Sequence, residues 1–178
     1  VVRSAGADPV HDLTLGTEVR LEPAGLVRVR AWVRDDRPEG GDGAGGRGAD
    51  LVVGELTPVL PVPDGADELL DTTGHHVLER RLVRTPFTPG ARLRESWEGR
   101  PGHDAVTWLA AGPAGFGWRS GRVHGVHLAW SGNTRHLALS TASGRKLLGA
   151  GELLLPGEVA LGPGRTYTSP WVVFSWGQ

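Results

Sequence analysis

Hydrophobic and polar residues alternate most clearly between Leu26 and Arg34. One face of this segment carries Val27, Val29, Ala31 and Val33, and the other carries Arg28, Arg30, Trp32 and Arg34. Successive side chains of a strand point to opposite faces, so this period of two predicts an antiparallel strand with one buried face.

Short apolar runs between glycine and proline turn signals predict eight further strands. These are Asp50–Thr57, Val77–Arg84, Ala91–Glu98, Ala105–Ala111, Arg122–Trp130, Arg135–Ser140, Glu158–Leu161 and Pro170–Trp176. Only Asp64–Asp71 predicts a helix, because Asp64 can cap it and its leucines can form an apolar stripe. We therefore expect an all-β protein: an antiparallel β-supersandwich of two packed sheets with one short helix, as a single domain over residues 1–178.

One segment of low complexity, "RPEGGDGAGGRGAD", covers residues 37–50 and contains six glycines. A glycine-rich chain loses much entropy on ordering and has little to bury, so we expect a flexible loop between two strands. A phosphate-cradling loop is the alternative, but the Gly-Lys-Ser/Thr ending and the following helix that it requires are missing.

Composition narrows the classes of partner. The chain has 178 residues, 19 basic and 20 acidic, and a net charge of −1, which disfavours nucleic acid or an anionic membrane. No apolar run approaches the roughly 20 residues of a membrane helix. Cysteine is absent, so disulfides and thiolate metal sites are excluded. The chain starts at Val1 and contains no methionine, so we expect a piece of a longer protein, with a cytoplasmic location as a further expectation.

The histidines do not predict a metal site. His124 and His127 are three residues apart on a predicted strand and should point to opposite faces. His75 and His76 are adjacent and should diverge if extended. A zinc site needs three or four converging ligands, and no spacing in the sequence supplies them.

Other polar residues that could take part in catalysis have simpler structural interpretations. Ser131 lacks the Gly-x-Ser-x-Gly context of a nucleophile elbow. Glycoside hydrolysis needs paired carboxylates, but we expect the available ones to be solvated or paired with arginine. These are Glu79, Glu95, Glu98, Asp104, Glu152 and Glu158.

Arginine and tryptophan each allow two interpretations. A dense arginine set forms either a cross-strand charge ladder or a surface that docks onto another domain. Its members are Arg80, Arg81, Arg84, Arg92, Arg94 and Arg100. Of seven tryptophans, we expect Trp32, Trp108 and Trp118 in the core. The others, Trp97, Trp130, Trp171 and Trp176, could stack on a sugar or cover a domain interface.

Several motifs occur in an order that resembles a known family. They are "ELLDTTGHHVLERRLVRTPFTPGARLRESWEGRPGHD" (68–104), "GFGWRSGRVHGVHLAWSGN" (115–133) and "GAGELLLPGEVALGPGRTYTSPWVVFSWG" (149–177). Together they resemble the N-terminal β domain of α-galactosidases of glycoside hydrolase family 36. The resemblance is close over residues 68–178 and loose over residues 1–67.

The resemblance implies a β-supersandwich that precedes a (β/α)₈ barrel in the same polypeptide. In the family, two aspartates of the barrel hydrolyse α-galactosides with retention. Their nucleophile motif has no counterpart here, so we expect no catalytic residue and no activity from this chain alone. The resemblance implies no cofactor and no metal. The expected partners are the barrel and an α-galactoside, with a homo-oligomer as a further expectation.

The resemblance also assigns candidate residues. The family's Gly-Arg-Trp segment, which faces the barrel mouth, corresponds to Gly74, His75 and His76, and Glu79 and Arg80 complete the motif. Histidines in the arginine and tryptophan places imply a polar wall or a relaxed subsite at the rim of the active site. The family's Trp-Ser-Gly-Asn turn, with a structural role, matches Trp130, Ser131, Gly132 and Asn133. The alternative function is a stand-alone carbohydrate-binding module or a structural interaction sandwich.

Overall fold

The computed structural model of the chain describes residues 1–38, 50–103, 107–117 and 119–177. The central part of the predicted glycine-rich loop, Trp118 and Asp104 lie outside the described residues. The described residues form strands and turns without a helix, so none of them forms a helix that could cross a membrane.

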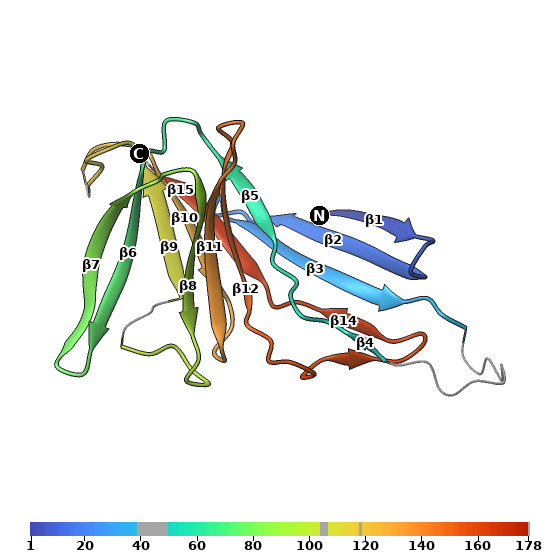
Figure 1. Cartoon of the computed structure of the whole chain (residues 1–178). Coiled ribbons are helices and arrows are strands. Elements are labelled where there is room, and N and C mark those ends of the chain that lie inside the picture. Colours follow the sequence, from blue (N-terminus) through green and yellow to red (C-terminus); the bar gives the residue numbers. More distant parts are fainter. Residues whose placement is uncertain (39–49, 104–106, 118, 178) are drawn as a thin grey trace.

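Figure 1 shows the strands coloured by their order along the chain. In order, they are β1 (Val2–Asp8), β2 (Leu13–Leu21), β3 (Val27–Asp35), β4 (Leu51–Val52), β5 (Val59–Val62), β6 (Glu68–His75), β7 (Leu78–Pro86), β8 (Gly90–Ser96), β9 (Trp108–Gly112), β10 (Val123–Leu128), β11 (Thr134–Ser140), β12 (Lys146–Glu152), β13 (Ala160–Leu161), β14 (Thr166–Thr168) and β15 (Val172–Gly177).

Two antiparallel sheets carry the architecture. The large sheet has nine strands in the order β1-β2-β3-β15-β10-β9-β6-β7, with β14 paired to β3. The small sheet has four strands in the order β5-β12-β11-β8, and Figure 1 shows it crossing the middle of the large one. A two-stranded ribbon of β13 and β4 lies beyond β14. The all-β supersandwich is thereby confirmed.

The main hydrophobic core lies between the two sheets. The large sheet contributes Leu109, Val126, Leu128 and Val172, each at most 1 % exposed. The small sheet contributes Ala138, Leu148 and Ala150, also at most 1 % exposed. Removing these side chains from water stabilises the sandwich, because each buried branched side chain contributes about 1.5–3 kcal/mol.

The strand predicted over Leu26–Arg34 is confirmed as β3, with Val29, Ala31 and Val33 buried. The helix predicted over Asp64–Asp71 is wrong, because β6 begins at Glu68 and pairs with β7 and β9. Leu69 enters the core between the sheets, whereas Leu70 packs on the opposite face with Ala110 and Phe116. A short apolar pair can belong to either element, and the antiparallel partners on both sides decided in favour of the strand.

The prediction that Trp32 and Trp108 lie in the core is also wrong. Both are half-buried. The indole of Trp32 lies over Gly16 of the neighbouring strand, where a Cβ would collide with the ring. Trp108 packs at the edge of the outer cluster around Ala110 and Phe116. An indole is large enough to cover an apolar surface from its edge without being fully buried.

Two glycines allow close packing inside the small sheet. A Cβ on Gly149 would lie 2.5 Å from Val59 Cγ1 and 2.8 Å from the Pro58 carbonyl oxygen. A Cβ on Gly151 would lie 2.7 Å from the Thr57 hydroxyl. The strand β12 therefore brings β5 and the residues before it against its own backbone because it has no side chain at these two positions.

A buried carboxylate joins the two sheets. Asp71 of β6, whose side chain is 4 % exposed, receives Arg92 at 3.2 Å and Arg94 at 2.8 Å from β8 of the small sheet. Arg94 also donates to the Thr72 carbonyl oxygen at 2.9 Å. These two arginines of the predicted charged set are thus partly buried partners of a buried acid.

The small sheet also contains a buried histidine. His136 of β11 is 1 % exposed, and its Nε2 has no hydrogen-bond partner among the described residues. Burial lowers the pKa of His136 to about 4, against smaller raising effects of the Thr107 backbone and the Asp71 charge. The imidazole is therefore neutral at physiological pH and behaves as part of the core.

Replacing Asp71→Asn should lower the free energy of unfolding by about 3 kcal/mol, because it leaves two partly buried arginines without their charge partner. Urea unfolding followed by circular dichroism measures the change. The matched control is Asp8→Asn, which removes an exposed pair with His11 and should cost less than about 1 kcal/mol. Equal effects of the two substitutions would contradict a role for Asp71 in joining the sheets.

Stability should fall as the pH drops from about 6.5 to about 4, because the unfolded chain protonates His136 in this window and the folded chain does not. The loss from this group amounts to roughly 3 kcal/mol and ends below the folded pKa. The free energy of unfolding, measured with urea and plotted against pH across this window, should have a smaller slope for His136→Gln than for the unmodified chain. His11→Gln, at an exposed position, is the control, and an unchanged slope in His136→Gln would refute the assignment.

Candidate functional site

The hairpin of β6 and β7 carries the predicted rim residues. His75 pairs with Leu78, so His76 and Val77 form the two-residue turn at the tip. The pairing shifts between Thr73 and His75, where Glu79 and Arg80 of β7 both lie opposite Gly74, so β7 carries a bulge at this point. A Cβ at Gly74 would collide with the Leu78 carbonyl oxygen, so the bulge requires glycine.

The tip holds two residues in an uncommon backbone conformation. Val77 has φ 77° and Arg80 has φ 52°, both in the left-handed region that a β-branched or long side chain avoids. The Arg80 N–H donates to the His103 carbonyl oxygen at 3.2 Å, which ties the tip to the segment that follows β8. Strain of this kind is retained where neighbouring contacts fix the backbone, and it often occurs at functional positions.

The four predicted residues gather at this tip, and all are exposed. His75 Nδ1 lies 2.7 Å from the His76 carbonyl oxygen. Glu79 Oε1 accepts from the Val77 N–H at 3.0 Å. Hydrogen bonds from the backbone N–H groups of Glu79 and Val77 lower the pKa of Glu79, so this carboxylate is ionised near neutral pH.

A fifth residue lies at the tip, and the sequence interpretation did not select it. His103 Nδ1 lies 3.9 Å from Glu79 Oε1, and the rings of His103 and His76 are 5.9 Å apart between centroids. His103 belongs to the "RPGHD" run that contributed to the family resemblance. That run was the available signal, but only the fold brings it to the hairpin.

The Trp130–Asn133 turn connects three segments. The side-chain oxygen of Asn133 accepts from the Gly99 N–H at 2.7 Å, and its carbonyl oxygen accepts from the Leu153 N–H at 3.0 Å. The Trp130 indole lies over Gly132, where a Cβ would be 2.5 Å from Nε1. Ser131 lies in the same turn and carries no arrangement of a nucleophile. The structural role assigned to this turn stays a prediction, and these contacts favour it.

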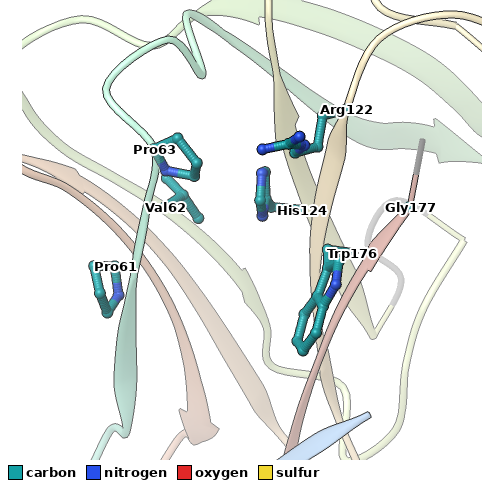
Figure 2. Close-up of a pocket in the computed structure, with 7 residues that line it drawn as sticks. All are labelled: Pro61, Val62, Pro63, Arg122, His124, Trp176 and Gly177. Atoms are coloured by element: carbon teal, nitrogen blue, oxygen red, sulfur yellow. The ribbon is translucent and has the colours of Figure 1, made fainter. Parts of the chain in front are cut away.

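A groove of about 830 Å³ opens between the edge of the small sheet and the large sheet. Figure 2 shows His124 of β10 and Arg122, the residue before that strand, on the side of the groove that faces Pro63, with Trp176 below them. Burial, followed by the charge of Arg122, lowers the pKa of His124. His127 lies on the opposite face of β10, in a separate hollow, as the alternation of the strand predicts.

No Asp or Glu lines this groove within the part of the chain that the structure describes. Two of the carboxylates considered earlier have partners elsewhere. Glu95 pairs with Arg135 at 2.7 Å, and Glu152 accepts from the Tyr167 hydroxyl at 2.6 Å. The groove can hold a small polar or aromatic-stacking ligand, but it does not supply the two facing carboxylates of a glycosidase.

The tryptophans that were candidates for sugar stacking are scattered. Trp97 and Trp130 lie near the Asn133 turn and are 57 % and 40 % exposed. Trp176 is 57 % exposed and lies beside His124, toward the other end of β10. Trp171 is half-buried beneath the guanidinium groups of Arg20, Arg28 and Arg30, which lie 4.5–4.8 Å from its ring centre.

Comparison with known proteins places this sandwich in a family. The sequence matches the family profile "Glycosyl hydrolase family 36 N-terminal domain" over residues 2–162. The chain belongs to that family, as its N-terminal domain. It is also 32 % identical over 171 residues to an "Alpha-galactosidase" of Escherichia coli, covering 96 % of this chain and 23 % of that protein.

Solved structures share the fold at lower identity. The galactosidase domain of the α-galactosidase-sucrose kinase AgaSK superposes with a TM-score of 0.77 at 21 % identity, covering 97 % of this chain and 23 % of that one. The α-galactosidase AgaB of Geobacillus stearothermophilus gives a TM-score of 0.75 at 19 % identity, with the same coverage. The chain thus spans about 23 % of the length of these relatives.

Proposed function

We propose that this chain is the non-catalytic N-terminal domain of an α-galactosidase, and that a catalytic (β/α)₈ barrel in the same polypeptide hydrolyses terminal α-galactosides. The match to the family profile over residues 2–162 carries the proposal. A relative that is 32 % identical is named as an α-galactosidase, and this chain corresponds to only 23 % of it. The remainder leaves room for a barrel, which needs about 250 residues.

The outer edge of the large sheet supports docking of the barrel at the β6–β7 hairpin. Strand β7 ends the sheet, and all residues from His75 to Leu82 are exposed. Leu78 and Leu82 are 48 % and 55 % exposed, and the exposed arginines Arg80 and Arg81 lie between them. An open edge strand of mixed apolar and basic character is commonly covered by another part of the protein.

We assign the hairpin tip to the rim of the active site in that assembly. The tip lies beyond the last strand pair, His75 and Leu78, and presents the Arg80 guanidinium as a hydrogen-bond donor and His75 Nε2 as an acceptor, which suits recognition of sugar hydroxyls. A contact between copies of the protein at the same edge is the second way in which the edge strand could be covered.

A stand-alone carbohydrate-binding module is the second candidate function, and the groove with Trp176, Arg122 and His124 is the observation that favours it. An exposed indole beside hydrogen-bond donors is typical of sugar recognition. Isothermal calorimetry of the chain with galactose or raffinose distinguishes the two functions. Millimolar binding that Trp176→Ala abolishes favours the module, and flat heats favour the domain of a larger enzyme.

The polypeptide that continues this domain into a barrel should hydrolyse an aryl α-galactoside, whereas the 178-residue chain alone should show no turnover. The reason is that the described residues contain no facing carboxylate pair in the groove. Release of the aryl alcohol measures the rate. Turnover by the 178-residue chain, or its absence from the longer polypeptide, would refute the proposal.

In the longer polypeptide, the double substitution His75→Ala and Arg80→Ala should raise KM for raffinose about threefold to tenfold. The value of kcat should stay within about twofold, because a contact at the rim is made equally in the ground state and the transition state. The effect should be smaller for an aryl galactoside, which reaches less far beyond the galactose. His11→Ala, on the remote β1–β2 hairpin, is the control. Unchanged KM values for both substrates would contradict the assignment of the hairpin tip to the rim of the active site.

A further inference from the structure

We propose that His76, Glu79 and His103 form a binding site for a divalent transition-metal ion, with Zn²⁺ as the best fit. One ligand atom from each of the three side chains lies within 4.8 Å of the others. This site does not depend on the proposed function, because it uses only residues that the structure describes. It also revises the expectation from sequence spacing that the chain has no metal site.

The distances fit a site that closes on a metal by small side-chain rotations. His76 Nδ1 and His103 Nδ1 lie 3.8 Å and 3.9 Å from Glu79 Oε1. Ligand bonds of about 2.0–2.1 Å in a tetrahedral zinc site place the ligand atoms about 3.3 Å apart. The two distances to Glu79 Oε1 therefore need to shorten by about half an ångström, and the separation of the two histidine ligand atoms, which is at most 4.8 Å, by up to about 1.5 Å. Exposed side chains rotate that far at little cost.

The backbone already holds the three residues in position. The Val77 N–H orients the Glu79 carboxylate at 3.0 Å, and the Arg80 N–H fixes the His103 carbonyl oxygen at 3.2 Å. A site whose ligands are oriented before binding loses less entropy when the metal arrives.

His75, the neighbour of His76 in the sequence, is arranged differently from the three proposed ligands. The Nδ1 atom of His75 lies 2.7 Å from the carbonyl oxygen of His76, and His75 is not one of the three converging residues. His75 therefore offers a control at the same hairpin tip with the same residue type.

The donor set defines the class of metal. Two imidazole nitrogens and one carboxylate oxygen suit Zn²⁺, and also Ni²⁺ or Cu²⁺, whereas Mg²⁺ and Ca²⁺ prefer oxygen ligands alone. Three protein ligands leave at least one position for water or another oxygen ligand. Because the side chains of His76, Glu79 and His103 are 85 %, 39 % and 55 % exposed, we expect affinity on the order of micromolar rather than that of a closed structural site.

Isothermal calorimetry of the 178-residue chain, without an added histidine tag, tests the site with ZnCl₂ and with MgCl₂. We expect one Zn²⁺ per chain and no binding of Mg²⁺. His76→Ala, Glu79→Gln and His103→Ala should each weaken Zn²⁺ binding about tenfold or more, whereas His75→Ala should leave it unchanged. His103→Asp, which supplies a carboxylate ligand, should recover part of the affinity that His103→Ala loses.

Zn²⁺ binding that is absent or unaffected by His103→Ala would overturn the site, and so would binding that His75→Ala weakens as much as His103→Ala does. Zn²⁺ should also raise the urea midpoint of the unmodified chain and not that of His103→Ala, because a ligand that binds only the folded state stabilises it. If the metal-free variants have the same urea midpoint as the unmodified chain, the loss of binding is not a loss of folding. A Zn²⁺-dependent rise of the urea midpoint in His103→Ala that equals the rise in the unmodified chain would likewise reject the site.

Discussion

The carboxylate of Asp71 connects the two sheets through Arg92 and Arg94, and the position of the exposed hairpin depends on this connection. Apolar packing alone allows sheets to slide, since it is non-directional. A buried acid with two charged donors from one facing strand fixes where β6 lies relative to β8. Because β6 continues directly into the tip, the same contact determines where the tip residues stand relative to the segment that carries His103.

The main features of the fold were predictable wherever side chains alternate strictly. Strand β3 is the clear case, because its valines face the core and its arginines face outward. Strands β1 and β2 escaped prediction because exposed residues dominate β1 and Gly16 interrupts the pattern of β2. Strand β12 escaped it because its glycines have low strand propensity and are explained only by the backbone that packs against them.

The candidate site was predictable in part, and for a different reason. A motif comparison led to His75, His76, Glu79 and Arg80, which are close in sequence and lie on one hairpin. His103 is distant in sequence, and its approach depends on a single backbone hydrogen bond to Arg80 and on the packing of β8. Convergence of this kind follows from tertiary contacts, so ligand spacing along the chain does not disclose it.

The glycines of β12 have a consequence beyond their own strand. Because Gly149 and Gly151 let residues 57–59 lie against the backbone of β12, they set how closely β5 and the residues before it approach β12. Pro61, Val62 and Pro63, which continue from that point, form one wall of the groove opposite His124 and Trp176 (Figure 2). A methyl group added at Gly149 or Gly151 would push residues 57–59 away from β12, so a substitution at a position that does not line the groove would displace the start of the strand that forms one of its walls.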